Sequence, residues 1–520
     1  MSSPRNIPDI ALRSAQQFGD RTAIVDGDIC LTFTEVRDEM LKVACALTAT
    51  GIQPGDRIGL WAPNSAVWIT SALGILASGA WLVPINTRFK ATEVATILDT
   101  VDASLLFVSE DFVAKKQLEA IGLDAPVLLP GLGEATRPEW EAFLGRASGS
   151  DPEVVLDRIS RIGPEDVSDV MFTSGTTGKP KGVMLRHGTT IRAYSDFNAR
   201  YGVGEGDRSL VALPFFHCFG YKAGWMVDLL AGATTYPLAV FDTRTVMSMI
   251  ERYAITHLPG APTMFWSVLE DPDRARYDLS SVRASIIGAA AIPVELVRRV
   301  RDDLGVNTVL AGYGLTESHA LVSISMPGDT PELVATTVGK VLDSLEVRTI
   351  DSEGRPLPPG AEGELMVRGH VQMTGYYRDP EATAAAFTDG WLHTGDIGTV
   401  DEQGYVRITD RKKDIYITGG FNVAPAEVEN VLAACEKISQ VAVVGVPDER
   451  MGEVGAAFVV PASGLPTTAE DIVAYARERL ANFKVPRHVL LVDALPTNAT
   501  GKVLKDELRS RFRAGSIIPD

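Results

Sequence analysis

The chain up to residue 160 alternates between segments with the hydrophobic spacing of helices and segments with that of strands. Residues 32–47 carry apolar side chains every three or four positions behind a Thr-x-x-Glu pattern, which is typical of the first turn of a helix. Residues 57–61 form a short apolar run, as in a buried strand, and residues 87–98 and 105–108 predict a further helix and strand. This alternation predicts an α/β architecture.

Three later apolar runs each end in a glycine-containing turn or a polar loop. They occupy residues 209–213, 285–290 and 308–317. In open α/β sheets, ligands bind outside the carboxyl ends of the strands, so these strand ends predict one shared ligand site. By contrast, residues 129–150 are rich in Gly, Pro and charged side chains and predict a surface connection.

A change of pattern near residue 346 predicts the domain organisation. Residues 346–368 alternate as short strands, which indicates a small β-barrel-like subdomain, and a dense charge run follows at residues 410–414. Beyond this run, the chain has apolar strands and helices of its own. We therefore predict a large N-terminal domain of stacked α/β subdomains plus the small β subdomain at residues 1–410, and a small α+β C-terminal domain at residues 411–520.

Composition narrows the classes of partner. The chain has 520 residues, of which 45% are hydrophobic and 22% are charged, and both values are ordinary for a globular protein. The 49 basic and 67 acidic side chains give a net charge of −18, which argues against nucleic acid or an anionic membrane as the main partner. The basic residues that matter for function should therefore be placed locally.

The sequence also suggests a cytoplasmic location. It has only four cysteines and no C-x-x-C pair, so it indicates neither a disulfide framework nor a zinc site. The first residues lack the apolar core of a signal peptide. The apolar residues 68–85 are interrupted by Thr, Ser, Gly and Pro, so a buried helix followed by a strand fits better than a membrane span.

Residues 173–182 form the most distinctive stretch of the chain. Three glycines, four hydroxyl side chains and two lysines in ten positions leave backbone N–H groups uncovered and attract anions, which predicts a polyphosphate-binding loop between two strands. Pro180 stands where a Walker A loop needs Ser or Thr, and a plain surface turn is the alternative reading. The candidate phosphate-binding residues are Thr173, Ser174, Gly175, Thr176, Thr177, Gly178, Lys179 and Lys181.

Several further motifs, taken together with this loop, resemble the adenylate-forming superfamily that includes the acyl-CoA synthetases. They follow one another with family-like spacing over nearly the whole chain, so the set is far more specific than any single motif. The resemblance implies the superfamily fold, with a large N-terminal domain and a small, mobile C-terminal domain. The motifs are Tyr-Gly-Leu-Thr-Glu at 313–317, Trp-Leu-His-Thr-Gly-Asp at 391–396, Asp-Arg at 410–411, Gly-Gly-Phe-Asn at 419–422 and Asn-Ala-Thr-Gly-Lys at 498–502.

The resemblance implies an AMP-forming acyl-CoA ligase that uses ATP, Mg²⁺ and coenzyme A. A carboxylate would attack the α-phosphorus of ATP to give an acyl-adenylate and pyrophosphate, and the CoA thiol would then attack the acyl carbon. Because charge builds on phosphate oxygens in the first step, catalysis should consist largely of positioning and electrostatic stabilisation.

The resemblance assigns the catalytic roles residue by residue. Lys502 would catalyse adenylation, Thr316 would bind the α-phosphate, and Glu317 would ligate Mg²⁺ together with Thr176. His217 would stand at the acyl site as a wall or gate. Without the motifs around them, Glu317 would be read as a solvated turn carboxylate, Lys502 as a surface lysine and His217 as a packed core histidine.

The same resemblance supplies the nucleotide, hinge and CoA residues. Asp396 would accept hydrogen bonds from the ribose hydroxyls, Tyr313 would stack on adenine near Gly288, and Arg411 would assist at the ribose or phosphate. Lys413 would be the hinge on which the C-terminal domain rotates between the two half-reactions. The loop that then closes on the CoA thiol channel would contain Gly419, Gly420 and Phe421.

The acyl group is constrained by what residues 215–219 lack. Amino-acid-activating relatives carry an aspartate there, whereas this chain has Phe-Phe-His-Cys-Phe, so an α-amino acid is a poor substrate candidate. Residues 215–224, 419–423 and 481–487 resemble actinobacterial CoA ligases of steroid-ring degradation, which act on a methylhexahydroindanedione propanoate. On that resemblance, Lys222 would bond a ring ketone. The predicted acyl-pocket residues are Phe216, Tyr221, Lys222, Trp225, Met264, Gly288, Ala289, His319 and Ala320.

Two alternatives stay open at this point. General medium- or long-chain fatty acyl-CoA ligases share much of the pattern, and an acyl-AMP ligase would pass its adenylate to a carrier protein instead of CoA. Such an acyl-AMP ligase would be expected to carry an insertion, and no extra segment stands out between residues 375 and 410. The sequence leaves the oligomeric state open, with a homodimer as one option.

Overall fold

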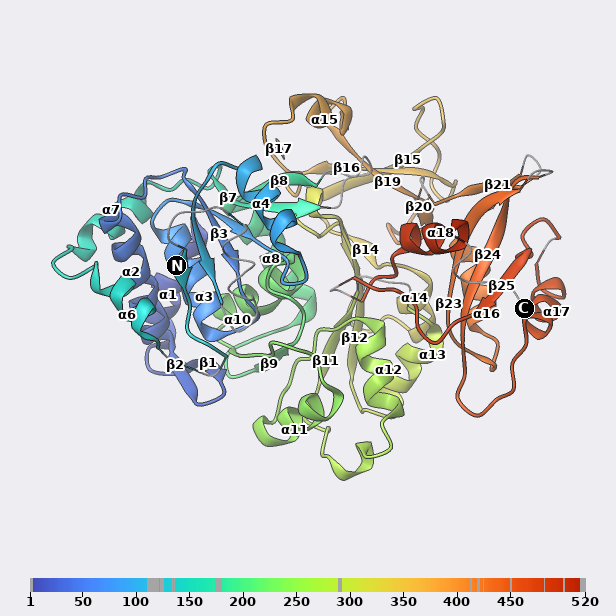
Figure 1. Cartoon of the computed structure of the whole chain (residues 1–520), viewed down its shortest axis with the longest axis horizontal. Coiled ribbons are helices and arrows are strands. Elements are labelled where there is room, and N and C mark those ends of the chain that lie inside the picture. Colours follow the sequence, from blue (N-terminus) through green and yellow to red (C-terminus); the bar gives the residue numbers. More distant parts are fainter. Residues whose placement is uncertain are drawn as a thin grey trace.

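The computed structural model describes residues 3–109, 121, 126–132, 134, 136–173, 180–288, 292–411, 414–418, 421–423, 425–448, 451–480, 482–498 and 501–514. Figure 1 shows a large N-terminal part made of several sheets and a smaller C-terminal part beside it. This arrangement confirms the predicted α/β fold with a large and a small domain.

A seven-stranded sheet carries the strands on either side of the predicted phosphate loop. β3 pairs in parallel with β4 and β5, and β4 pairs in parallel with β7, whereas β7 and β8 are antiparallel. In spatial order, its strands are β17 (Gly375–Tyr376), β8 (Lys181–Arg186), β7 (Val167–Thr173), β4 (Trp81–Pro84), β3 (Arg57–Trp61), β5 (Ala103–Val108) and β6 (Val127–Leu128).

Two further sets of four strands are linked to each other through His257, which bridges Ser209 on one side and Ala284 on the other. Together they bring the ends of β9 and β11 to one side of the molecule. The first set is β2 (Ile29–Thr32), β1 (Thr22–Asp26), β10 (Thr234–Pro237) and β9 (Arg208–Val211), and the second is β11 (Ala284–Ile287), β12 (Thr308–Tyr313), β13 (Ser323–Ile324) and β14 (Lys340–Val341).

The helices cover these sheets and build the main core. The predicted helix after Thr32 is α2, and both hydrogen bonds of the capping box between Thr32 and Glu35 are present. The helix predicted over residues 87–98 is α4, which begins only at Ala91 because Lys90 takes an extended backbone. The helices of this part are α1 (Ile7–Phe18), α2 (Phe33–Ala49), α3 (Ala66–Ala77), α4 (Ala91–Thr100), α6 (Pro138–Gly145), α7 (Pro152–Arg161), α8 (His187–Tyr201), α9 (Cys218–Gly220), η1 (Tyr221–Met226), α10 (Val227–Ala231), α11 (Thr243–Tyr253), α12 (Pro262–Glu270), η2 (Arg274–Arg276), α13 (Val294–Asp302), η3 (Thr316–Ser318) and α14 (Pro331–Thr336).

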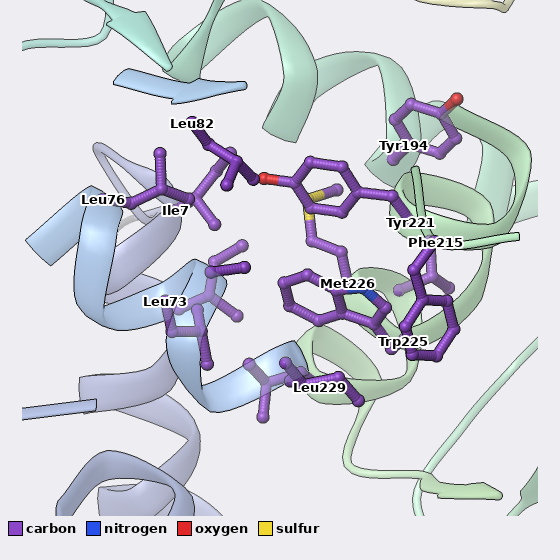
Figure 2. Close-up of a cluster of buried hydrophobic side chains, with 14 of the residues drawn as sticks. Ile7, Leu73, Leu76, Leu82, Tyr194, Phe215, Tyr221, Trp225, Met226 and Leu229 are labelled. Carbon is purple, nitrogen blue, oxygen red and sulfur yellow. The ribbon is translucent and has the colours of Figure 1, made fainter. Parts of the chain in front are cut away.

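The centre of the main core is aromatic. The rings of Tyr221 and Trp225 stack with their centroids 4.9 Å apart, and the edge of Trp68 from α3 contacts both at 5.9 and 6.1 Å. Figure 2 shows these two rings enclosed by aliphatic side chains such as Leu73 and Leu229. Aromatic pairs of this kind contribute about 0.5–1.5 kcal/mol each beyond the apolar area they bury.

The predicted β subdomain is present as a five-stranded antiparallel sheet. Its register runs from β15 through β16 to β19, which pairs with β18 on one segment and with β20 on another. The elements are β15 (Leu345–Ile350), β16 (Gly363–Gly369), β18 (Phe387–Thr388), β19 (Trp391–Val400) and β20 (Val406–Arg411), with the short helix α15 (Pro380–Ala385) between β17 and β18.

The C-terminal part has its own sheet with a separate apolar cluster on each face. Successive residues of β23 alternate between them, with Val443 facing α16 and α17, and Val444 packed with Leu508 of α18. No helix in the described ranges is long and apolar enough to cross a membrane. The elements are β21 (Tyr416–Thr418), β22 (Phe421–Val423), α16 (Pro425–Ala433), β23 (Ile438–Asp448), β24 (Gly452–Pro461), α17 (Ala469–Arg477), β25 (His488–Leu491) and α18 (Lys505–Arg513).

Candidate active site

The predicted phosphate loop connects two antiparallel strands. β7 ends at Thr173 and β8 begins at Lys181, and these two residues are partners in the strand register. Ser174, Gly175, Thr176, Thr177, Gly178 and Lys179 lie outside the described residues. The structure therefore fixes where the loop starts and ends, next to the strand β17 that pairs with β8.

The predicted metal ligand Glu317 lies on the short helix η3, a few residues after β12. The hydroxyl of Tyr376 donates a hydrogen bond to Glu317 Oε1 at 2.9 Å, and Lys181 Nζ lies 4.9 Å from the centroid of the Tyr376 ring. Burial and the Glu317 charge raise the pKa of the Tyr376 phenol, so it remains a donor at neutral pH. The end of the phosphate loop and the candidate metal ligand thus meet at one tyrosine.

Sequence reasoning missed Tyr376. Its only local signal is the pair Gly375-Tyr376, which follows the β16 strand of the subdomain. Its tertiary partners come from residues distant in the chain, since Glu317 is 59 positions away.

The residues predicted to hold the ribose and adenine come together at a second tyrosine. Tyr313, at the end of β12, donates a hydrogen bond from its hydroxyl to Asp396 Oδ2 at 2.5 Å. Asp396 is 3% exposed and lies on β19 opposite Arg411 in the register with β20. Residues 83 positions apart in sequence therefore form one cluster, as the motif assignments require.

Lys502 approaches the large domain on a tight turn between β25 and α18. The Asn498 side chain accepts a hydrogen bond from Lys502 N at 2.9 Å, and Asn498 N donates to Lys502 O at 2.8 Å. A Cβ built on Gly501, whose φ is +80°, would lie 3.2 Å from Thr263 Oγ1 at the start of α12. The Gly-Lys pair is therefore docked against the large domain, and Figure 1 shows this segment extending back from the C-terminal part.

His217 of the large domain lies near enough to Lys502 for the lysine charge to affect its pKa. Burial and then the positive charge of Lys502 lower the pKa of His217 to about 4. Its Nδ1 accepts a hydrogen bond from Phe219 N at 3.3 Å, so the neutral ring carries its proton on Nε2. The structure thus brings two of the predicted catalytic residues together across the domain boundary.

Several predicted acyl-pocket residues are buried and pack in the core of the large domain. Tyr221 and Trp225 are 0 and 1% exposed and stack in the aromatic cluster, because together they bury a large apolar surface. His319 is also fully buried, with Nε2 accepting from Arg186 N and Nδ1 bonded to Val371 O. Phe216, Met264 and Ala320 are half-buried, and Ala289 lies outside the described residues.

Lys222 is the most unusual of these residues. Its Nζ lies 3.0 Å from Asp169 Oδ1 and donates to Thr190 Oγ1 at 3.2 Å, and Lys222 and Asp169 are both 0% exposed. Asp169 was missed, although a lone aspartate in the apolar strand β7 was a visible signal. Its second oxygen accepts a hydrogen bond from Ser168 Oγ at 2.6 Å. A fully buried ion pair survives only when its charges are paired, so each partner depends on the other.

Gly288 lies where the Phe219 ring packs against the end of β11. It follows β11, and a Cβ at this position would lie 3.1 Å from the Phe219 ring and 3.7 Å from Gly312 O. Glycine thus allows the aromatic ring of Phe219 to approach the strand end.

The residues around Glu317 suit a magnesium ion. In the ranges that the structure describes, no group of three or more His, Cys, Asp or Glu side chains forms a metal cage. Mg²⁺ prefers octahedral oxygen coordination and is commonly held by one or two carboxylates plus substrate phosphates and waters. A single half-buried carboxylate next to the phosphate loop matches that donor set.

The described strands on either side of the predicted hinge belong to different sheets. β20 ends at Arg411 in the sheet of the large domain, and β21 begins at Tyr416 in the sheet of the small domain. Lys413, Gly419 and Gly420 lie outside the described residues, and Phe421 begins β22.

Comparison with known proteins identifies the family of the chain. Residues 12–377 match the AMP-binding enzyme family, and residues 427–502 match the AMP-binding enzyme C-terminal domain. The chain is 46% identical to a 3-[(3aS,4S,7aS)-7a-methyl-1,5-dioxo-octahydro-1H-inden-4-yl]propanoyl:CoA ligase of Rhodococcus jostii, over 97% of this chain and 98% of the relative. It is 45% identical to the ligase of the same name from Mycobacterium tuberculosis, again over 97% of this chain and 98% of the relative.

Solved structures give the same result. The crystal structure of an anthranilate CoA ligase in complex with anthranoyl-AMP superposes with a TM-score of 0.88 at 28% identity, and the match covers 99% of both chains. The chain therefore belongs to the AMP-binding enzyme family, as an AMP-forming acid–thiol ligase.

Proposed function

We propose that this ligase activates a propanoate side chain carried on a fused two-ring ketone of steroid origin. The observation that carries this proposal is the 46% identity, over nearly the full length, to a ligase named for that acyl group. The absence of a carboxylate among residues 215–219 supports an acyl group without an ammonium. A general medium-chain fatty acyl-CoA ligase is the principal competitor.

In the first half-reaction, the carboxylate of the substrate attacks the α-phosphorus of ATP. Lys181 and the loop residues before it would hold the β- and γ-phosphates, and Thr316 would contact the α-phosphate. Lys502, whose neighbour Gly501 approaches α12, would bring its ammonium to both the attacking carboxylate and the α-phosphate. These contacts stabilise the charge that develops on the phosphate oxygens.

Glu317 and Thr176 would hold Mg²⁺ at the phosphate end of the site. The ion supplies Lewis-acid stabilisation of phosphate charge when it is bound. Asp396 would accept hydrogen bonds from the ribose hydroxyls, with Tyr313 and Arg411 beside it. Adenine would stack on the Tyr313 ring near Gly288.

His217 contributes as a neutral donor. Because its pKa is about 4 and Nδ1 is occupied by Phe219 N–H, Nε2–H can donate to an acyl oxygen without adding a positive charge. Phe216, Met264 and Ala320 would shape the wall that contacts the acyl group. Lys222 is paired with Asp169, so a hydrogen bond from Lys222 to a ring ketone would weaken that ion pair.

In the second half-reaction, the C-terminal domain rotates about Lys413 and brings a different surface to the acyl-adenylate. Lys502 leaves the site, and the loop with Gly419, Gly420 and Phe421 closes on the channel for the CoA thiol. The thiol then attacks the acyl carbon and AMP departs. The small domain therefore serves both steps with different residues.

We also propose that the enzyme acts in the cytoplasm, where ATP and CoA are available. Its four cysteines are free, and three of them are buried, which suits a reducing compartment. A homodimer remains a prediction, and the molar mass in solution, measured by light scattering, would test it.

A carboxylate panel tests the substrate. The bicyclic dione propanoate, octanoate, palmitate and ferulate are each incubated with ATP, Mg²⁺ and CoA, and AMP and the CoA thioester are quantified separately. We expect kcat/KM for the bicyclic propanoate to exceed that for octanoate by at least ~10-fold, since pocket shape discriminates acyl groups by this order. Equal turnover of octanoate would contradict the ring substrate, and AMP without thioester would favour an acyl-AMP ligase that loads a carrier protein.

A further inference from the structure

We propose that Tyr376 is a positioning residue that presents Glu317 to the metal ion bound with ATP. The inference deepens the proposed function, because it rests on Glu317 as the Mg²⁺ ligand. Its starting point is the hydrogen bond of 2.9 Å from the Tyr376 hydroxyl to Glu317 Oε1. A carboxylate has two oxygens, so a donor fixed on Oε1 sets the plane of the group and directs Oε2 toward a cation.

The backbone around Tyr376 is held independently of any ligand. β17 pairs with β8, and Tyr376 lies opposite Val183 in that register. Tyr376 N donates to Thr383 Oγ1 at 2.9 Å. Met373 N donates a hydrogen bond to the Glu317 carbonyl at 2.8 Å. The segment from Met373 to Tyr376 therefore bonds to both the backbone and the side chain of Glu317. A donor anchored in this way can restrict the carboxylate before ATP arrives.

The ring of Tyr376 adds a second contact. Lys181 Nζ lies 4.9 Å from its centroid, within the range of a cation–π interaction. One side chain therefore contacts both the lysine that ends the phosphate loop and the carboxylate proposed to hold the metal. The hydroxyl and the ring can be separated by substitution, since phenylalanine keeps the ring and removes only the hydrogen bond.

The proposal predicts an effect confined to magnesium. In Tyr376→Phe, the Glu317 carboxylate loses a charge-assisted hydrogen bond and becomes free to rotate, so binding of the cation should weaken by about 10-fold. The apparent KM for Mg²⁺ in ATP–pyrophosphate exchange should rise by about 10-fold, while kcat at saturating Mg²⁺ stays within about 3-fold of the parent. Thioester formation from supplied acyl-adenylate should be unchanged, because pyrophosphate and its metal have already left.

Calorimetry supplies a readout that does not depend on turnover. ATP is titrated into the full-length protein with excess Mg²⁺ and, separately, with EDTA. In the parent protein Mg²⁺ should strengthen ATP binding, and in Tyr376→Phe this gain should shrink by about 10-fold, while affinity in EDTA stays the same. The matched control is Tyr377→Phe, because the neighbouring hydroxyl points to Val101 O at 3.4 Å and its ring contacts Trp81.

Glu317→Gln separates failure of the inference from failure of the proposed metal site. Suppose that the increase of ATP affinity caused by Mg²⁺, here called the Mg²⁺ gain, is lost in Glu317→Gln but kept in Tyr376→Phe. This result would overturn the positioning role of Tyr376 and leave Glu317 as the metal ligand. An unchanged Mg²⁺ gain in Glu317→Gln would overturn the metal assignment and, with it, the inference. An equal fall of ATP affinity with and without Mg²⁺ in Tyr376→Phe would assign the tyrosine a merely structural role and overturn the inference as well. The inference is supported if both variants lose the gain and Tyr377→Phe keeps it.

Discussion

The two domains hold their functional residues in opposite ways. In the large domain, some of the predicted polar site residues are fixed by a partner from a distant segment, as Asp396 is by Tyr313 and Glu317 is by Tyr376. In the small domain, Lys502 lies on a turn that meets the large domain across the domain boundary. The contacts there include the approach of Gly501 to Thr263 and a hydrogen bond of 3.5 Å from Arg88 to Thr497 O, at the long limit for such a bond.

This difference suits a reaction with two steps. Groups that bind ATP gain from being fixed in advance, since no reorganisation is then needed when charge develops. In the proposed mechanism, Lys502 serves only the first step and would have to leave before the thiol enters. A turn on a separately folded domain can do so by moving together with that domain.

The largest expected effect on activity comes from making the backbone rigid at the junction between the two domains. Lys413→Pro restricts the backbone at the predicted hinge, so the domain should no longer reach the thioester-forming orientation. We expect CoA-thioester formation from supplied acyl-adenylate to fall below detection, while ATP–pyrophosphate exchange remains. Lys413→Ala, which keeps a flexible backbone, is the control. Unchanged thioester turnover in Lys413→Pro would break the comparison between a fixed and a mobile domain.

Removing the ammonium group of Lys502 should affect the first half-reaction, in which the acyl-adenylate forms. We expect Lys502→Ala to lower acyl-adenylate formation by ~10²–10⁴-fold, the range for the loss of one transition-state contact. Thioester formation from supplied adenylate should survive. Lys505→Ala is a matched control on the same domain, since Lys505 pairs with Glu429 at 2.9 Å within the small domain. Equal loss of both half-reactions would mean that Lys502 maintains the fold of the site.

A third change tests how strongly the large domain is fixed. Lys222→Met removes one member of the fully buried pair and leaves the Asp169 carboxylate without its counter-charge. We expect a loss of about 3–5 kcal/mol in the free energy of unfolding, measured by thermal or urea unfolding. Adding Asp169→Asn should recover a large part of that loss. If Lys222→Met alone were as stable as the parent, the Lys222–Asp169 pair would not contribute to the stability of the core.

The smallest effect concerns acid stability. Burial lowers the pKa of His187 to about 3, and burial lowers those of His217 and His257 to about 4, whereas an unfolded histidine titrates near 6.5. As the pH falls through this window, the unfolded chain binds protons that the folded chain does not. Each histidine therefore removes ~1.4 kcal/mol of unfolding free energy per pH unit.

Asp228 has the opposite effect on the pH dependence of stability. Burial raises its pKa to about 7, so the folded chain holds one proton that the unfolded chain lacks. Because the histidines outnumber this carboxyl group, the melting temperature should fall between about pH 7 and about pH 5. Differential scanning calorimetry at several pH values measures this, and His187→Gln should lessen the fall. A melting temperature that rises on acidification would contradict the buried neutral histidines.

Comparison of the patterns with the structure shows which inferences are local. The helix after Thr32 and the strand at residues 57–61 follow from spacing and a capping box within a few residues of each other, and both are confirmed. Residues 129–150 were expected to be a surface connection, and this is wrong in part. Within them α6 buries Trp140 and Phe143 against Phe107, a partner that no local pattern specifies.

The sequence by itself determined the family, the two-domain α/β fold and the order of the motifs around the nucleotide, because these depend on local spacing and on residues that match position by position. The tertiary structure decided which side chains share a partner. It placed Lys222 against Asp169 in the core, and it joined Glu317 to Tyr376 across 59 residues. Burial and charge pairing act between segments that are neighbours only after folding, so the pattern along the chain could single out Asp169 but could not show which side chain pairs with it.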